Sequence, residues 1–228
     1  MKIHQDKRSS PIRALAFAAA TCVGIWYFVA EYMVATAWPA PGYSYIHNYV
    51  SDLGVPICAS GGRFVCSPWH DVMNMTFFAV GLGSLVGMVA LASLFRGSRR
   101  YMVGLLGTVQ SVGIMLVGVA PGSFAEDITH DTTQMFLHSI GALLAILGTC
   151  VTALVVGALL WRQSRRFALL SLLLGAAPFV LLALQALTGI ENLGLGRGGF
   201  ERVGVYAAMV WIACAGIYGI LVLRRRDK

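Results

Sequence analysis

QMFLHSIGALLAILGTCVTALVVGALL, residues 134–160, is a stretch of 27 residues without a charged side chain. A helix of about 20 apolar residues spans the hydrocarbon core of a bilayer. Backbone polar groups cannot bond to water there, so a span of this kind has to be helical. The stretch therefore predicts a transmembrane helix. The whole chain agrees with this, because 57% of its residues are hydrophobic and only 12% are charged.

Five further stretches have a similar length and apolar character. They cover residues 12–36, 72–95, 101–120, 167–188 and 203–223. A long loop, residues 37–71, separates the first two spans. We therefore expect an all-α, polytopic integral membrane protein in which residues 1–228 form one six-helix bundle. The composition excludes both a soluble globular domain and a disordered chain.

The placement of basic residues predicts the orientation of this bundle. Fourteen of the 17 lie at the N-terminus, in the two short turns 96–100 and 161–166, and at the C-terminus. Lysine and arginine are enriched on the cytoplasmic side of membrane proteins. We therefore expect a multi-pass protein of the cytoplasmic (inner) membrane, with both termini in the cytoplasm. The net charge of +7 then reports orientation, and no nucleic acid partner is expected.

Two of the five cysteines, Cys58 and Cys66, lie eight positions apart in the long loop. In the expected orientation this loop faces an oxidising compartment, where thiols pair. We therefore expect a disulfide between them. A two-cysteine metal site is the less favoured alternative, because the CxxC spacing is lacking. The other three cysteines lie inside spans and are expected to be packing residues.

Polar and ionisable residues concentrate at the outer ends of the spans and in the outer loops. The residues singled out on this ground are Glu31, Asn48, Ser51, Asp52, His70, Asp71, Asn74, His130, Gln134, His138, Gln185, Glu201 and Arg202. Burying such groups near lipid is costly unless they have a partner or a watery cavity. Five of the six spans contribute to the set, which predicts a polar pocket that opens outward from the bundle.

Three histidines of this set suggest a metal site. His130, Gln134 and His138 lie on one stripe of a helix because of their i, i+4 and i+8 spacing. His130 and His138, together with His70, are candidate ligands for zinc or a similar divalent metal. A metal-bound water could then attack an ester or amide near the lipid headgroups. The alternative is a hydrogen-bonded polar network that pins helix ends and loops.

The other residues of the set receive roles within the same pocket. The candidate catalytic residues are Glu31 as a general base, Asp52 as a further ligand or orienting group, and Ser51, from which a Ser-His-Asp triad can be drawn with His70 or His138. The ligand-binding candidates are Asn48, Asp71, Asn74, Gln134, Gln185, Glu201 and Arg202. Arg202 can pair with Glu31 or with Asp52. Residues 194–199 contain a GxGxxG pattern without a preceding strand, so we expect a flexible loop there.

Several of these motifs together resemble a known family. The run NYVSDLG, residues 48–54, follows the first span, and the second span is rich in glycine. A histidine opens the fourth span, and Gly194-Leu195 and Glu201-Arg202 lead into the sixth. Over residues 14–223 the chain is similar to the uncharacterised prokaryotic six-helix membrane family called domain of unknown function 998. The resemblance implies a six-helix bundle and no established activity.

A looser analogy links the chain to the superfamily of alkaline ceramidases and progestin/adiponectin-type receptors. Those proteins hold zinc with Ser, Asp and His side chains, but they have seven spans and a His-x-x-x-His element that this chain lacks. Our first hypothesis is a pocket that binds or hydrolyses a lipid-like or small polar ligand, with membrane lipids as partners. The alternative is a non-catalytic accessory or scaffold subunit that contacts other envelope membrane proteins. A transporter is disfavoured, because the inner halves of the spans carry no polar path.

Overall fold

A computed structural model describes the chain over residues 11–61, 63–122 and 132–226. Its long helices are α1 (Pro11–Thr36), α2 (His70–Ala92), α3 (Ser98–Val119), α5 (Thr132–Leu160), α6 (Arg165–Thr188) and α7 (Gly196–Arg226). Each of them is long and apolar enough to cross a membrane. The six predicted spans and the all-α class are therefore confirmed.

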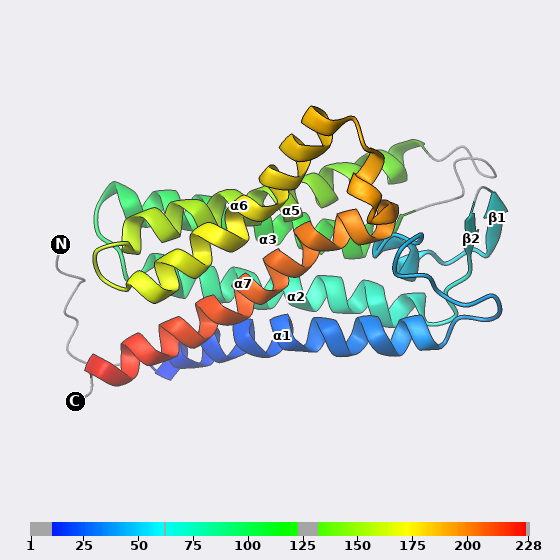
Figure 1. The fold of residues 1–228 in the computed structure, drawn as a ribbon. Coiled ribbons are helices and arrows are strands. Elements are labelled where there is room, and N and C mark those ends of the chain that lie inside the picture. The colour runs from blue at the N-terminus through cyan, green and yellow to red at the C-terminus, as the bar shows by residue number, and fades with distance from the viewer. Residues whose placement is uncertain (1–10, 62, 123–131, 227–228) are drawn as a thin grey trace.

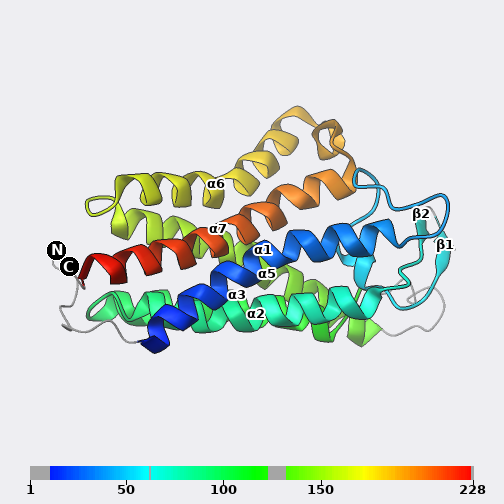
Figure 2. The ribbon, with the colours of Figure 1, turned by 90° about the horizontal axis from the view of Figure 1, so that it is seen from below.

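The six helices form a closed ring in the order of the chain (Figures 1 and 2). Each helix packs against the next, and α1 also packs against α7, which closes the ring. The α2–α3 and α5–α6 turns lie at the end where α1 starts and α7 finishes, which we call the basic end. Residues 37–69 lie at the opposite end, which we call the loop end. The assignment of the basic end to the cytoplasm stays a prediction from the charges.

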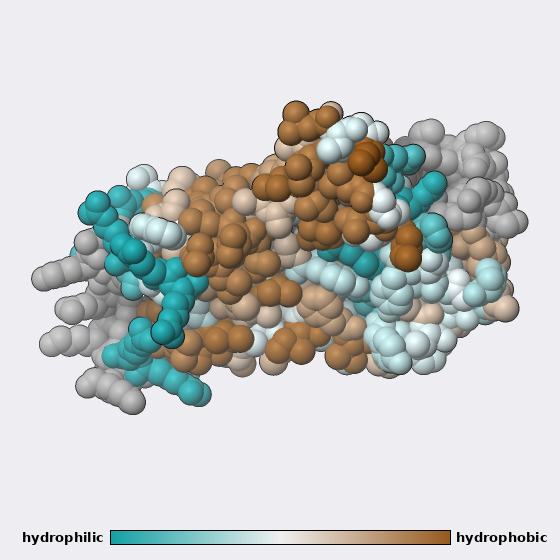
Figure 3. Space-filling view, in the orientation of Figure 1, coloured by the Kyte–Doolittle hydropathy of each residue, from teal (hydrophilic) through white to brown (hydrophobic). Residues whose placement is uncertain are grey.

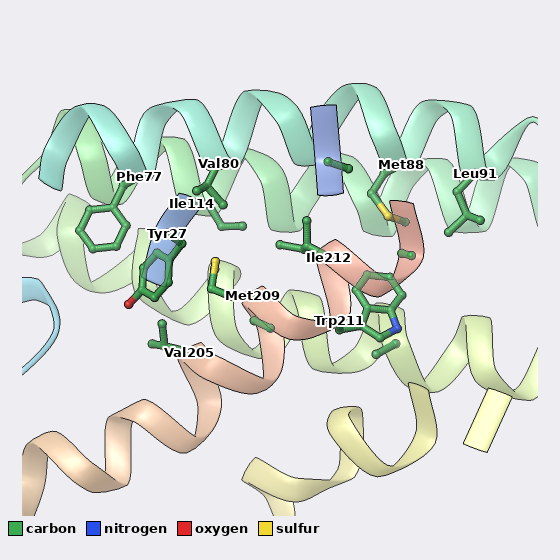
Figure 4. Packing of buried hydrophobic residues seen from close by; sticks show 14 of the residues in the cluster. Tyr27, Phe77, Val80, Met88, Leu91, Ile114, Val205, Met209, Trp211 and Ile212 are labelled. Atoms are coloured by element: carbon green, nitrogen blue, oxygen red, sulfur yellow. The ribbon is translucent and has the colours of Figure 1, made fainter. Parts of the chain in front are cut away.

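The surface and the interior divide as expected for a bundle in lipid. On the face that Figure 3 shows, a hydrophobic band covers the middle of the bundle, and hydrophilic residues gather toward both ends. Inside, large side chains such as Tyr27, Trp211 and Ile212 are almost completely buried (Figure 4). Trp211 Nε1 donates a hydrogen bond to Ser171 Oγ at 3.0 Å, which joins α7 to α6. The charged side chains of the surface thus gather toward the ends, while a few neutral polar side chains form hydrogen bonds inside the bundle.

The loop between α1 and α2 is folded onto the bundle. It contains a short 3₁₀ helix, η1 (Ser51–Gly54), and an antiparallel hairpin of β1 (Ala59–Gly61) and β2 (Arg63–Val65). The predicted disulfide between Cys58 and Cys66 is confirmed, and it joins the two sides of the hairpin. Leu53 and Val65 are fully buried, so the loop covers the end of the bundle. The sequence does not predict these strands, because three residues each are too few to show a strand pattern.

Helix α7 begins earlier than predicted. The sequence places its start at residue 203, whereas the helix begins at Gly196. The expectation of a flexible loop over residues 194–199 is therefore wrong, because residues 196–199 form the first turn of α7 and Gly194 ends a short 3₁₀ helix. Glu201 and Arg202 consequently lie inside a helix.

Contacts with the long loop explain this early start. The Gly198 N–H donates a hydrogen bond to the Ile46 carbonyl at 2.9 Å. A Cβ on Gly198 would collide with the carbonyl oxygen of Asn48. Gly196 has a φ of +70°, which glycine adopts without strain, and a Cβ there would meet Ile46. The two glycines therefore let the loop backbone lie directly against the first turn of α7.

Candidate functional site

An arginine and a glutamate are buried together near the loop end. Arg202 Nε donates to Glu31 Oε1 at 3.1 Å, and the two side chains are only 6% and 3% exposed. The Tyr206 hydroxyl, one turn further along α7, donates to the same carboxylate oxygen at 3.1 Å. The sequence allows Glu31 or Asp52 as the partner of Arg202, and in the structure the Nε of Arg202 bonds to Glu31. The ion pair joins α1 to α7.

The same guanidinium also holds the long loop. Arg202 Nη1 donates to the backbone carbonyls of Gly198 (2.9 Å), Tyr45 (2.8 Å) and Asn48 (3.0 Å). Its Nη2 donates to the Tyr43 hydroxyl. The rings of Tyr43 and Tyr45 lie 5.3 and 4.8 Å from the guanidinium carbon, within range of a cation–π attraction. Arg202 therefore anchors the loop to both α1 and α7.

Three tyrosines contact Arg202 or Glu31, and the sequence by itself does not single them out. The Tyr43 hydroxyl accepts from Arg202 and donates to the Tyr49 carbonyl at 2.8 Å. Burial raises the pKa of the Tyr43 hydroxyl above its usual value. No spacing rule connects Tyr43 to an arginine 159 positions away. Tyr206 does leave a signal, because its i, i+4 position places it on the same face of α7 as Arg202.

Asn48 and Asp52 shape the loop from within. The Tyr49 N–H donates a hydrogen bond to Asp52 Oδ2 at 2.9 Å. The same oxygen lies 3.4 Å from Asn48 Nδ2. On α2, Asn74 Nδ2 donates to the Gly54 carbonyl at 2.9 Å, which fastens η1 to the bundle. These contacts match the polar network that the sequence leaves open as an alternative. The catalytic roles expected of Glu31 and Asp52 stay predictions.

Two glutamines predicted as ligand-binding residues link backbone segments. Gln134 Nε2 donates to the Pro121 carbonyl at 3.0 Å, which ties α5 to the segment after α3. Gln185 Oε1 accepts from the Asn192 N–H at 3.1 Å, in the short helix η2 (Glu191–Gly194) between α6 and α7. Each side chain thus fixes a backbone segment next to its own helix.

The predicted metal site is not assembled in the part of the chain that the structure describes. His138 is buried in α5, whereas His70 lies at the start of α2 with its Nδ1 3.2 Å from Asp71 Oδ1. His130 lies outside the described residues. Within the described ranges, no group of three or more His, Cys, Asp or Glu side chains is placed to hold a metal ion. These residues therefore give the zinc hypothesis no support.

A small cavity lies next to η1, where the loop meets the helices. Its volume is about 50 Å³, enough for a few water molecules. Three polar side chains, Ser51, His138 and Glu201, stand in a wall that is otherwise apolar. Glu201 Oε2 accepts a hydrogen bond from the Val50 N–H at 2.6 Å, which holds the start of η1 at the cavity.

His138 and Ser51 border the same part of this cavity. His138 Nδ1 lies 2.8 Å from the Ala120 carbonyl oxygen. A carbonyl can only accept, so Nδ1 carries the proton and Nε2 is left as an acceptor. A Cβ on Gly122 would lie 3.4 Å from Nε2 and 3.7 Å from the Cβ of Ser51. Ser51 and His138 therefore both lie beside Gly122 at this cavity.

A larger groove opens beside the cavity, between α5, α6 and α7. Its volume is about 360 Å³, and its walls are apolar apart from Ser139 and Glu201. Ala142, Ile146 and Glu201 line both hollows, so the two adjoin. Pro178 lies inside α6 at the groove, and the second half of α6 leans away from the bundle (Figures 1 and 2). The cavity thus adjoins a groove at the lipid-facing side of the helices.

Comparison with known proteins finds one relationship. The family model described as a protein of unknown function (DUF998) matches residues 20–218, which is most of the chain. No curated protein and no solved structure matches. The matched segment contains the buried ion pair, the cavity and the groove, and it agrees with the resemblance drawn from the motifs.

Proposed function

We propose that this chain, which belongs to the DUF998 family of proteins of unknown function, binds a lipid-like amphiphile between its helices. The polar head lies in the small cavity, beside Ser51, His138 and Glu201. The aliphatic part lies in the groove between α5, α6 and α7. In the orientation predicted from the basic residues, this groove opens into the outer leaflet of the cytoplasmic membrane.

The observation that carries the proposal is the junction of the two hollows at Ala142, Ile146 and Glu201. A cavity of about 50 Å³ with polar side chains, next to an apolar groove of about 360 Å³, suits a molecule with a small head and a hydrocarbon tail. Ligand sites are mostly apolar, with a few placed polar groups. His138 Nε2 and the Glu201 carboxylate are acceptors, so a head with hydroxyl or amino donors fits best.

Filling the junction tests the proposal. We expect Ala142→Trp to lower labelling by a monoacylglycerol with a diazirine on its acyl chain by about tenfold, because the ring occupies the space between cavity and groove. Labelling is measured in proteoliposomes by peptide mass spectrometry. The quantity compared is the labelling that an excess of monoacylglycerol without the diazirine suppresses. Ala158→Trp, at an exposed position on α5, is the matched control and is expected to label normally. Equal labelling of the two folded variants contradicts the proposal.

Ester hydrolysis is a second candidate function, favoured by the shared border of Ser51 and His138. In this reaction the Ser51 hydroxyl attacks the ester carbonyl while His138 Nε2 takes the hydroxyl proton. The acyl group becomes bonded to Ser51 Oγ, and the alcohol leaves with the proton from the histidine. Water then cleaves this acyl ester and regenerates the hydroxyl.

A fluorophosphonate probe, which reacts with activated serine hydroxyls, tests the hydrolytic candidate. We expect labelling at Ser51, and we expect His138→Ala to slow it about a hundredfold, since a general base contributes roughly that much. His47→Ala, at an exposed position of the long loop, is the matched control and is expected to leave the rate unchanged. If Ser51 stays unlabelled while the monoacylglycerol binds, the function is binding alone. If neither probe labels the cavity, the accessory or scaffold function is favoured.

A further inference from the structure

A second groove lies at the basic end of the bundle, between α6 and α7. Its volume is about 350 Å³, and it shares no lining residue with the cavity and groove near the loop end. Ser164 and Arg166, at the start of α6, line it together with Arg225, at the end of α7. Each of the two helices thus contributes one arginine to the groove, although the two arginines lie far apart in the sequence.

The remaining wall of this groove is apolar. The rings of Phe167 and Tyr218 stack with centroids 4.3 Å apart and planes within 5° of parallel, which holds α6 and α7 together at this depth. Ile217 and Leu221 lie one turn apart on α7, line the groove, and are 44% and 47% exposed. A hydrocarbon surface therefore continues from the two arginines toward the middle of the bundle.

The charge at this end is uniformly positive among the described residues. Arg166 and Arg225 are exposed, and Arg162, Arg165 and Arg224 lie beside them in the sequence. The carboxylates of the described residues all lie toward the loop end: Glu31, Asp52, Asp71, Glu191 and Glu201. Within the described part of the chain, no carboxylate neutralises the groove, so it presents a positive potential to the membrane surface.

We propose that this groove binds an anionic phospholipid of the leaflet at the basic end. The phosphate lies between Arg166 and Arg225, and one acyl chain lies along Ile217 and Leu221. Arginine presents its donors in a fork that matches phosphate oxygens, and basic sites between transmembrane helices recognise anionic headgroups. A soluble anion would use the arginines alone. The adjoining apolar wall therefore favours a lipid as the occupant.

Native mass spectrometry of the full chain in detergent micelles tests this site. The probes are phosphatidylglycerol and phosphatidylcholine with identical acyl chains. We expect phosphatidylglycerol to be retained in preference, and Arg166→Gln/Arg225→Gln to weaken its binding about tenfold. The matched control is Arg96→Gln/Arg100→Gln, which removes the same charge from the α2–α3 turn and the first turn of α3, at the same end of the bundle. This control is expected to bind phosphatidylglycerol as the unaltered chain does.

Three results would overturn the proposal. Equal retention of the two lipids would remove the role of charge. Equal losses in the two double variants, at matched helix content by circular dichroism, would show that positive charge anywhere at this end suffices. Displacement of phosphatidylglycerol by millimolar inorganic phosphate at constant ionic strength would assign the groove to a soluble anion. None of these results bears on the cavity near the loop end, which shares no residue with this groove.

Discussion

Arg202→Met is expected to lower the free energy of unfolding by about 3–5 kcal/mol. Methionine replaces the aliphatic stem of arginine, but it leaves the buried Glu31 carboxylate without its cation. It also removes the donors that the carbonyls of Gly198, Tyr45 and Asn48 use. Losing one partner of a buried pair is costly because the other charge stays out of water. Reversible unfolding by sodium dodecyl sulfate in mixed micelles, followed by tryptophan fluorescence, measures the change.

Two further variants make this result specific. Arg197→Met removes an exposed arginine five positions earlier on α7 and is expected to change the stability by no more than about 0.5 kcal/mol. Glu31→Gln/Arg202→Met removes both charges and is expected to be more stable than Arg202→Met alone. Similar losses for Arg202→Met and Arg197→Met would contradict the anchoring role of Arg202.

Gly198→Ala is expected to detach the long loop from α7 and to cost about 3 kcal/mol. The added Cβ collides with the Asn48 carbonyl oxygen and lies 2.9 Å from Arg202 Nη1. The carbonyl belongs to the backbone and the guanidinium is held by the loop and Glu31, so neither moves independently. Hydrogen exchange measures the detachment. We expect faster exchange of the Val50 amide, which donates to Glu201 in the attached loop.

Gly199→Ala is the matched control for this variant, because it makes the same change at the next position of the same helical turn. The nearest atom to its added Cβ is Leu195 Cβ at 3.4 Å, an ordinary contact. Alanine also favours a helix over glycine, so stability is expected to rise by up to about 1 kcal/mol. If the two variants lose stability equally, the close approach of the loop at Gly198 is not what requires glycine there.

The spans were predictable because each one is a local property of the chain. In lipid a backbone segment has to satisfy its own hydrogen bonds, so an apolar run such as residues 134–160 is recognisable without its neighbours. The Cys58–Cys66 disulfide was predictable for a similar reason, because its partners lie close in sequence within the long loop between the first two spans. The start of α7 was not predictable. Gly196 and Gly198 disfavour a helix locally, and contacts with the loop override that preference.

The candidate site was predictable in its residue types and only partly in its contacts. The sequence picks out Glu31 inside the first span and Arg202 at the edge of the sixth, because charges within or beside an apolar span need partners. Their pairing across 171 positions was one of two alternatives, and only packing decided between them. The predicted metal site shows the same limit. The spacing of histidines along one helix shows that they share a face, but it does not show which other helices pack against that face.

The sequence by itself determined the class of the protein, its six spans, the disulfide and the concentration of polar residues near one end. Each of these follows from a requirement that lipid or an outer compartment imposes on a short segment. Only the tertiary structure decided that Arg202 joins α1, α7 and the loop, that Ser51 and His138 border one cavity, and that this cavity adjoins a groove. These features depend on how closely separate helices approach, and that distance is set by the packing of the whole ring.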